Sequence, residues 1–252
     1  MMKKYDFNVN KVYCLFMHFF CVFISITLLS GCQKNKEYIV LPMKAKPVID
    51  GILDSIWLSI PVEPIEGDIV GALYRHGDED LSANFRCGYY DNALYFFIDV
   101  TDDNCRYWGD TIITKNENDL IQLFFAKGNK KLSAKEMTAT DSIFQLTLIY
   151  GRYKEETKKV YEYTYRYAQA DTHKGYYFEV EVPIIESIYD NRSGKIGFNI
   201  EVRDNDNEFD PADGVVRGVE TIINWSDQGA KLFWQQTKYY GDLILKDYKK
   251  SK

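Results

Sequence analysis

Alternation of apolar and polar residues is the strongest pattern in the chain, and it is clearest between residues 83 and 103. One run carries apolar residues at every second position, Ala83, Phe85, Cys87 and Tyr89, and the next run does so at Leu94, Phe96, Ile98 and Val100. Because strand side chains alternate between two faces, each run predicts a β-strand. The Asp91-Asn92 turn between them predicts an antiparallel hairpin. We place this hairpin at the centre of a sandwich, since its apolar face requires a second sheet to cover it.

Similar alternation predicts further strands at Asp68–Arg75, Asp119–Ala126, Ser142–Tyr150, Val160–Ala168, Tyr176–Pro183, Ile196–Arg203 and Lys238–Lys246. No long amphipathic helix competes with them. The expected fold is all-β, a two-sheet antiparallel β-sandwich of jelly-roll type. Two irregular stretches, Cys105–Asn118 and Asp204–Gln236, are long for loops in a compact β domain, and such loops usually carry function.

Composition supports strands and argues against a nucleic-acid partner. The chain has 20 tyrosines and 15 phenylalanines, side chains that suit a pleated surface. Its formal net charge is −6, and removing the net +2 of residues 1–31 leaves −8. An acidic surface without a basic stripe repels phosphate backbones, so we expect no nucleic-acid binding.

The N-terminus has the pattern of a secretory signal. Lysines occur at positions 3, 4 and 11, a mostly apolar run extends from Val12 to Leu29, and Leu29-Ser30-Gly31-Cys32 follows. The last four residues resemble the lipobox of bacterial lipoproteins, in which the cysteine receives the lipid. The alternative is an uncleaved membrane-spanning helix, because a run of this length just spans a bilayer. His18 interrupts the run, and small residues precede Cys32, which favours cleavage.

This pattern predicts three parts: a lipoprotein signal peptide over residues 1–31, a lipidated N-terminus and spacer over 32–40, and one β-sandwich domain over 41–252. Acyl chains on Cys32 would anchor the protein to the bacterial cell envelope, with the outer membrane as the expected site.

Two cysteines remain in the predicted mature domain, Cys87 and Cys105. A disulfide is compatible with an oxidising compartment, but Cys87 lies on the apolar face of its strand, which favours a buried thiol. The sequence has no CxxC motif, and only His76 and His173 remain after the leader, so zinc is not supported.

The stretch Pro47–Trp57 precedes the hairpin. Asp50-Gly51 predicts a tight turn, Asp54 suits the N-cap of a helix or an Asx-turn, and Trp57 then becomes a buried anchor at one end of the sandwich.

Seven segments in order, PVIDGILDSIW, YYDNALYFFIDVTDDN, NDLIQLFF, GYYFEVEVPI, GKIGFNIEVRDND, INWSD and YYGDLIL, together resemble the motifs of family 9 carbohydrate-binding modules. They cover nearly the whole predicted domain, from Pro47 to Leu245. The resemblance implies a DOMON-like β-sandwich that binds sugars at a shallow aromatic slot and sometimes carries structural calcium.

The resemblance also implies a sugar site clamped by two tryptophans. Trp234 matches one of them, because it precedes Gly241 by seven residues as in the family pattern. The other position is occupied by Asn116, and Trp108 in the same loop is the nearest substitute. Gln122 stands where the family has a glutamate, and Gln145 where it has an arginine.

Physical chemistry supports the same site. An aromatic ring stacks on the apolar face of a sugar ring, while side-chain amides bind adjacent hydroxyls. Trp234, Trp108 and Tyr107 lie in the two longest loops and are the expected platforms, with Gln122 and Gln145 as polar partners. The alternative for Trp234 is packing onto the sandwich edge. Trp225, in INWSD, is expected to be structural.

Two acidic groups make calcium the one candidate cofactor. Asp204 and Asp206 belong to a run of acidic and amide residues, and Asp102 and Asp103 form a second group with Asp119. Calcium prefers several oxygen ligands, although the EF-hand glycine and terminal glutamate are absent. The alternative is a polar turn after a strand.

Enzyme chemistry has little support. Glu179 and Glu181 project from one face of a strand, as a glycosidase carboxylate pair would, but their spacing is wide for a retaining pair and a solvated outer face explains them. No GxSxG motif or phosphate-binding loop occurs. We therefore expect no catalysis.

Three functions are weighed. The first is non-catalytic glycan binding by an envelope-anchored lipoprotein, which serves glycan uptake or a neighbouring degradative enzyme. The second is an adaptor lipoprotein that has lost the sugar site and contacts a protein through a tyrosine-rich strand face, Tyr161, Tyr163, Tyr165 and Tyr167; packing against neighbouring strands is the alternative for that face. A haem-binding redox domain is disfavoured by the scarcity of histidine.

Overall fold

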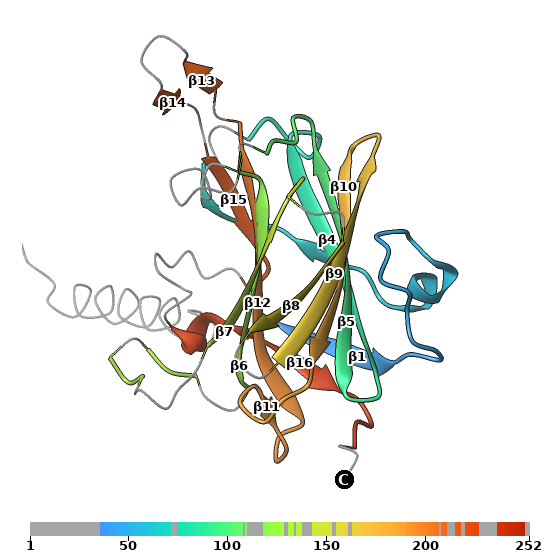
Figure 1. Ribbon diagram of the computed structural model, residues 1–252. Helices are drawn as coiled ribbons and strands as arrows, with labels where there is room; N and C mark the ends of the chain where they lie inside the picture. The colour runs from blue at the N-terminus through green and yellow to red at the C-terminus, as the bar shows by residue number, and fades with distance from the viewer. Residues whose placement is uncertain are drawn as a thin grey trace, which may run out of the picture. The chain divides into compact units, whose positions relative to one another are not determined.

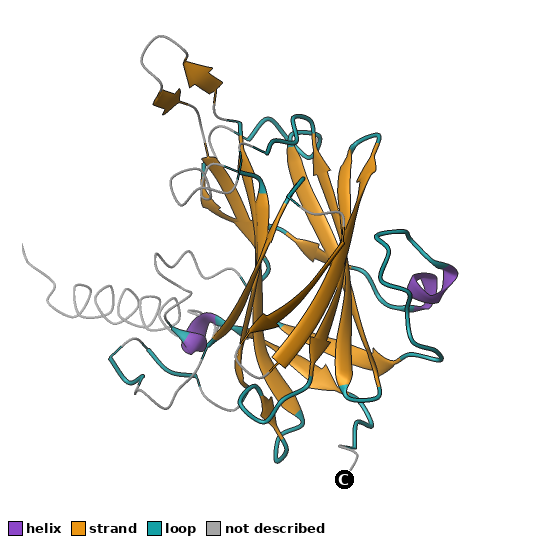
Figure 2. Ribbon diagram, in the orientation of Figure 1, coloured by secondary structure: helices purple, strands orange, loops and turns teal. Residues whose placement is uncertain are grey.

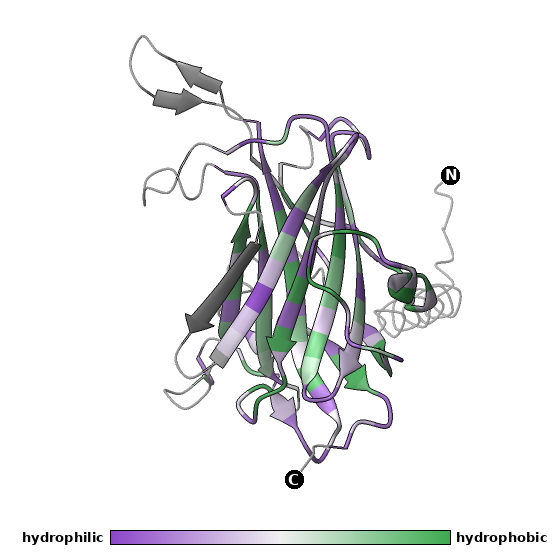
Figure 3. Cartoon of the chain, turned by 45° about the vertical axis from the view of Figure 1, so that its right-hand side comes forward, coloured by the Kyte–Doolittle hydropathy of each residue, from purple (hydrophilic) through white to green (hydrophobic). Residues whose placement is uncertain are grey.

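A computed structural model describes residues 36–71, 75–107, 109, 118–128, 131–133, 135–137, 143–152, 155–160, 163–206, 208–210, 215–217, 220–226 and 236–249. They belong to one compact unit, Asn35–Lys252. Strands dominate, and hydrophobic and hydrophilic residues alternate along them (Figures 2 and 3). Among these residues no helix has the length and apolarity needed to cross a membrane.

The first sheet is built around the predicted hairpin. Its strands lie in the order β4 (Leu81–Tyr90), β5 (Ala93–Asp102), β10 (Gly175–Pro183), β9 (Tyr163–Thr172) and β8 (Glu155–Val160), all antiparallel. The short β2 (Glu63–Ile65) pairs with the free side of β4. The hairpin prediction is confirmed, and Asp91 in its turn has a positive φ of 51°.

The second sheet is organised by the long strand β12 (Lys195–Asn205). On one side β12 pairs with β6 (Leu120–Lys127), which in turn pairs with β7 (Phe144–Ile149). On the other side the first half of β12 pairs with β16 (Gly241–Leu245) and the second half with β15 (Glu220–Asn224). Two short strands complete the sheet, β3 (Gly67–Val70) beside β15 and β11 (Tyr189–Asp190) beside β12.

Strand β1 (Glu37–Pro42) joins the two sheets. Residues 37–40 pair in parallel with β16, and residues 41–42 pair in parallel with β4. This strand differs from the sequence prediction, because residues 37–40 were expected to be spacer and β1 pairing was not predicted. Strands β13 (Glu208–Asp210) and β14 (Val215–Arg217) form a separate two-stranded ribbon (Figure 1).

The main core lies between the facing sheets. The eight alternating residues of the β4–β5 hairpin all belong to it, as do Leu123, Phe125, Phe198, Ile200 and Trp225 from the second sheet or its end. Rings of Phe85, Phe96 and Phe198 contact one another across the two sheets, with centroid distances of 5.2 to 6.5 Å. Cys87 is a fully buried free thiol, as predicted, and Cys105 is a half-buried free thiol. Trp225 is structural, as expected.

Several strand predictions needed correction. The predicted strand Val160–Ala168 is replaced by two paired strands, β8 and β9. Tyr165 and Tyr167 are buried in the core, so packing is confirmed for these two residues. Tyr161 and the side chain of Tyr163 lie outside the described part of the chain. The stretch Asp204–Gln236, expected to be irregular, contains β13, β14 and β15.

An excursion of the chain, residues 43–62, covers the outer face of the first sheet. It includes the short 3-10 helix η1 (Ser55–Ser59), which carries Trp57 against Tyr95 and Phe97 of β5 in a second apolar cluster (Figure 2). Gly51 begins the turn with φ of 80°, and a Cβ there would lie 2.7 Å from the carbonyl carbon of Gln169. Asp54 occupies the predicted N-cap position without a side-chain capping hydrogen bond.

Glu179 fastens this excursion to the sheet. Its carboxylate accepts hydrogen bonds from the backbone N–H groups of Asp50 and Gly51, both 2.8 Å, and from Trp57 Nε1, 2.6 Å. The solvated outer face expected for Glu179 is therefore wrong, because the excursion buries this residue completely. Glu181 behaves differently: its carboxylate pairs with the exposed Lys46 at 2.9 Å.

We expect Glu179→Ala to lower the free energy of unfolding by about 3 kcal/mol, because it leaves three donors, two of them buried, without their acceptor. Glu181→Ala is the matched control two residues along the same face. It removes an ion pair with the exposed Lys46 and one hydrogen bond from the Tyr95 hydroxyl, so it should cost less, about 1 kcal/mol. Urea unfolding followed by tryptophan fluorescence compares the two variants. Equal losses would contradict the role assigned to Glu179.

Candidate functional site

A row of polar side chains crosses the outer face of the second sheet. Strand register places Gln122 opposite Thr147 on one side and Glu201 on the other, and Glu201 opposite Asn224. We call Thr147, Gln122, Glu201 and Asn224 the polar row. Neighbouring residues on these strands point inward to the core, such as Ile121, Leu123 and Val202, so the row lies on the outer face.

Hydrogen bonds hold parts of the polar row. Gln122 Nε2 donates to Thr147 Oγ1 at 3.3 Å, and an Arg203 guanidinium nitrogen donates to Glu201 Oε1 at 3.0 Å. Glu201 is only 2% exposed. Because the carboxylate and the guanidinium form an ion pair, the row and its arginine carry no net charge.

Two amides beside this pair have unused hydrogen-bonding capacity. Asn199 Oδ1 accepts the backbone N–H of Ser226 at 3.0 Å, but Asn199 Nδ2 is buried and has no partner among the described residues. Asn224 Oδ1 is likewise buried and has no hydrogen-bond partner among the described residues. Buried polar atoms are nearly always hydrogen-bonded, so such atoms indicate a bound water or ligand. This side of the sheet therefore holds one buried donor and one buried acceptor that the described residues do not satisfy.

The structure brings together part of the predicted sugar site. Gln122 is half-buried on β6 and Gln145 is exposed on the adjacent β7, and both lie on the outer face. Tyr107 is 39% exposed and lies against Gly151, just after β7. Trp108, Trp234, Asn116 and Cys32 fall outside the described residues, so the aromatic clamp stays a prediction.

Sequence reasoning missed Glu201, Arg203, Asn199 and Asn224. A signal was present in the strand predicted at Ile196–Arg203, where three polar residues alternate with buried apolar ones. Their partners across β6 and β15 depend on register, which the sequence pattern did not define.

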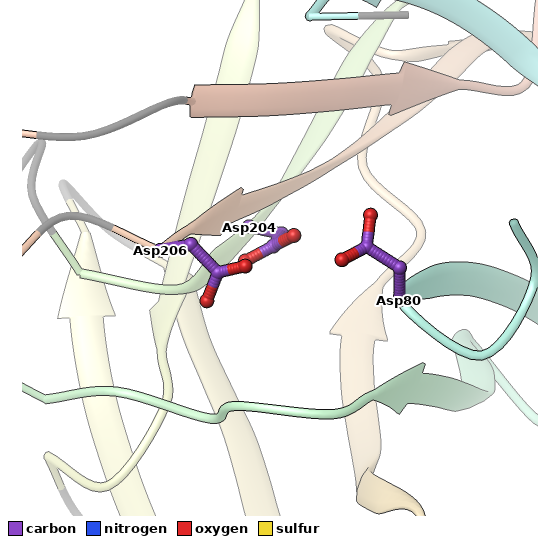
Figure 4. A group of neighbouring side chains, drawn as sticks. All are labelled: Asp80, Asp204 and Asp206. Atoms are coloured by element: carbon purple, nitrogen blue, oxygen red, sulfur yellow. The ribbon is translucent and has the colours of Figure 1, made fainter. Parts of the chain in front are cut away.

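A second feature is a cluster of acidic residues at one end of the sandwich. Asp80 precedes β4, Asp102 ends β5, Asp119 precedes β6, Asp204 lies near the end of β12 and Asp206 follows it. We call these residues the acidic cluster. They form two groups whose carboxylate oxygens lie within 4.8 Å of one another, Asp80 with Asp204 and Asp206, and Asp102 with Asp119 and Asp204. Figure 4 shows the first group, its side chains converging from separate segments.

The two acidic groups predicted from the sequence are thus one cluster. Asp80 was missed, because it is distant in sequence and only the fold brings it near Asp204. Asp103 is exposed and belongs to neither group. The polar-turn alternative is wrong for Asp204, which is buried within strand β12.

Hydrogen bonds from the protein orient these carboxylates. Asp119 accepts the backbone N–H of Asn205 at 2.9 Å and that of Arg106, and Asp102 Oδ1 accepts the N–H of Asn104 at 2.8 Å. Asp80 Oδ2 accepts the N–H of His76 at 2.8 Å. Such contacts typically hold ligating carboxylates in place around a metal ion.

The electrostatics of the cluster favour a cation. Burial, and then the negative charge of Asp102, raises the pKa of Asp204 to about 9. Burial also raises the pKa values of Asp102 and Asp119. The negative charge of Asp206 adds to the rise at Asp102, and that of Asp102 adds to the rise at Asp119. Asp102 Oδ2 and Asp204 Oδ1 are buried with no hydrogen-bond partner among the described residues. A set of oriented, buried carboxylate oxygens fits a hard divalent cation such as calcium.

One comparison with known proteins identifies a family. The family model for the carbohydrate family 9 binding domain-like domain matches residues 49–248. A search of curated proteins found no match.

Solved structures share the fold. A family 9 carbohydrate-binding module from Caldicellulosiruptor kristjanssonii in complex with glucose has a TM-score of 0.56 and 19% identity, covering 86% of this chain and 99% of that one. A family 9 module from the same organism in complex with cellotriose has a TM-score of 0.56 and 20% identity, covering 85% and 95%. A protein from Bacteroides uniformis has a TM-score of 0.54 and 10% identity, covering 84% and 100%.

In a buffer at pH 7 containing EDTA, we expect Asp204→Asn to raise the free energy of unfolding by about 1–3 kcal/mol, because the raised pKa of Asp204 means that this carboxyl must take up a proton on folding, whereas an amide need not. Asp78→Asn, in the turn before β4 but exposed, is the matched control and should change stability by less than about 0.5 kcal/mol. Chemical unfolding of the chelated chains measures both. A loss of stability in Asp204→Asn under EDTA would contradict the electrostatic description.

Proposed function

Because the chain belongs to the carbohydrate family 9 binding domain-like family, we propose that it binds glycans without catalysis, through the outer face of its second sheet. The observation that carries this proposal is the polar row, four hydrogen-bonding side chains in register across β7, β6, β12 and β15. The related family 9 modules were solved with glucose and with cellotriose. A site that binds sugars requires such convergent donors and acceptors.

The chemistry of the row suits a neutral sugar. Gln122 and Gln145 offer both donors and acceptors to adjacent hydroxyls, and Asn199 Nδ2 offers a buried donor. The Glu201–Arg203 ion pair leaves the face without net charge. We propose that Trp234, with Trp108 or Tyr107, supplies the stacking surface for the sugar ring. Affinity should be modest, because a shallow face must displace water from many hydroxyls.

We further propose that the protein acts as an envelope lipoprotein. The lipobox-like Leu29–Cys32 supports lipid attachment at Cys32 and tethering to the outer membrane. β1 begins at Glu37, so a short tether would hold the sandwich close to the membrane surface. A tethered sugar-binding domain would retain glycan for uptake or for a neighbouring degradative enzyme.

An adaptor role is the second candidate, and one surface favours it. The excursion over the first sheet exposes several large apolar side chains, Val48, Ile52, Leu53, Leu58 and Val62, between 38% and 67%. Exposed apolar groups concentrated on one segment are typical of protein contacts. The tyrosine-rich strand face suits this role less, since Tyr165 and Tyr167 are core residues.

Structural calcium is the proposed cofactor. The acidic cluster draws from the ends of β4 and β5 in the first sheet and of β6 and β12 in the second, so a cation there would hold the sheets together. The fit rests on the buried, unpartnered oxygens of Asp102 and Asp204. The role of this cation would be structural, because the acidic cluster lies at the end of the sandwich, where the two sheets meet.

For the sugar site, we expect cellotriose to bind the purified full-length chain in calorimetry. Gln122→Ala should weaken binding about fivefold, the equivalent of one hydrogen bond of about 1 kcal/mol. Trp234→Ala should weaken it more, because it removes a whole stacking surface.

Leu58→Ala, on the opposite sheet's excursion, is the control and should leave the affinity unchanged. Wild-type affinity in Gln122→Ala would refute the polar row as the site. No heat from any neutral glycan tested would favour the adaptor role instead.

For calcium, we expect chelation to lower the melting temperature. At a concentration 100-fold above its dissociation constant, one bound ion adds about 2.7 kcal/mol, or roughly 5–10 °C for a chain of this size. Differential scanning fluorimetry with calcium chloride and with EDTA measures the shift. Identical melting temperatures would count against a structural cation.

A further inference from the structure

We infer that a cluster of exposed apolar side chains beside the N-terminal strand rests on the bilayer to which the chain is anchored. We call it the apolar surface, and it consists of Ile39 from β1 with Val48, Ile52, Leu53, Leu58 and Val62 from the excursion. The envelope lipoprotein proposed above is the premise on which this inference rests, and the new element is the face of the sandwich that meets the lipid. A protein partner is the competing occupant, because exposed apolar groups suit either.

Exposed apolar side chains are concentrated on this surface. Seven large apolar side chains are exposed among the described residues, and six of them belong to it, with Tyr107 as the exception. Leu58 and Val48 are the most exposed, at 67% and 61%. Because apolar groups gain free energy when they leave water, this surface is the part of the described chain that lipid would cover.

The excursion holds these side chains outward. Its other apolar residues, such as Ile49, Trp57 and Ile60, are buried in the second apolar cluster beneath it. Glu179 fixes the same segment to the sheet through three hydrogen bonds. The inward positions are therefore already filled, so docking would bury the exposed side chains while ordering few groups.

The apolar surface begins close to the point where the anchor would hold the chain. β1 starts at Glu37, five residues after Cys32, and a fully extended chain of that length spans at most about 18 Å. The strand leads directly into the excursion (Figure 1). Ile39 shares a strand face with Leu41, whose side chain packs against the second apolar cluster. The tether therefore brings lipid close to the edge of this surface.

The apolar surface also lies in a neutral segment of an acidic chain. Residues 38–62 contain Lys44 and Lys46 with Asp50 and Asp54, so their net charge is zero, against −8 for the predicted mature chain. Anionic headgroups repel acidic proteins, so a neutral segment can approach lipid most closely. Both lysines are exposed, and their ammonium groups can reach lipid phosphates while their stems lie along apolar groups. This charge pattern favours lipid over a protein partner.

Docking through the apolar surface would orient the sugar site. The excursion covers the outer face of the first sheet, whereas the polar row lies on the outer face of the second. A chain that rests on lipid through its excursion therefore points the polar row away from the membrane, toward the solution that carries the glycan.

The test places a spin label on the apolar surface of the full-length chain. Leu58→Cys, produced in a bacterial envelope, is labelled with a nitroxide and reconstituted into vesicles of phosphatidylethanolamine and phosphatidylglycerol. Wild type treated in the same way supplies the background from the native cysteines. Electron paramagnetic resonance compares relaxation by oxygen, which concentrates in lipid, with relaxation by a water-soluble nickel complex. Asp78→Cys, exposed in the turn before β4, is the matched control.

We expect oxygen to dominate at position 58 and the nickel complex at position 78. Adding Ile52→Ser to the chain labelled at position 58 should lower the ratio of docked to undocked chains about tenfold, because one inserted aliphatic side chain is lost. Circular dichroism checks that each variant is folded.

Flotation and intact mass separate this inference from its premise. If chains that float and carry lipid on Cys32 leave position 58 as open to nickel as position 78, docking is overturned and the lipoprotein proposal stands. Shielding that occurs only in native envelopes would assign the surface to a protein partner, and spin–spin broadening between chains would assign it to a second copy. Either result would also overturn docking on lipid. Absence of lipid on Cys32 would refute the lipoprotein proposal and this inference with it.

Discussion

Five carboxylates gathered where two β-sheets end are the constraint on which this end of the sandwich depends. An uncompensated buried charge costs several kcal/mol, while a whole domain is stable by only about 5–15 kcal/mol. The sequence nevertheless places aspartates at the start or end of β4, β5, β6 and β12, where the fold must bring them together. We propose that neutralisation by a divalent cation turns this repulsion into a link between the sheets. The β5–β6 connection and the end of β12 are attached to the same aspartates through backbone hydrogen bonds.

The two outer faces of the sandwich have different chemistry. The first sheet is covered by its own chain, because Glu179 accepts three hydrogen bonds from the excursion and Trp57 packs against β5. The second sheet keeps a row of polar side chains on its outer face, including an ion pair and amides with unused capacity. Among the described residues, the convergent donors and acceptors that hydroxyl recognition needs therefore lie on the second face. Strand β12 carries both Glu201 and Asp204, so one strand contributes to both the polar row and the acidic cluster.

Local pattern predicted the core well. Period-two alternation in the β4–β5 hairpin identified eight buried residues of its inner face, since burial against a second sheet imposes that pattern, although Leu81 at the start of β4 was not included. Burial of Glu179 could not be predicted in this way, because it depends on an excursion that is 120 or more residues distant in sequence. The proximity of Asp80 to Asp204 could not be predicted either, because the two residues are distant in sequence and only the fold brings them together. β1 was missed because a short strand that pairs in parallel with two sheets carries little alternation of its own. The family motifs located Gln122 and Gln145, but register across β6, β12 and β15 was needed to find Glu201 and Asn224.

Amide hydrogen exchange in calcium and in EDTA tests most directly whether cations hold the two sheets together. The account predicts that the amides of Asn104, Arg106 and Asn205, which donate to the aspartates, exchange at least tenfold more slowly in calcium. Amides in the middle of the β4–β5 hairpin should exchange at the same rate in both conditions. Equal protection of the three amides with and without calcium would contradict the account.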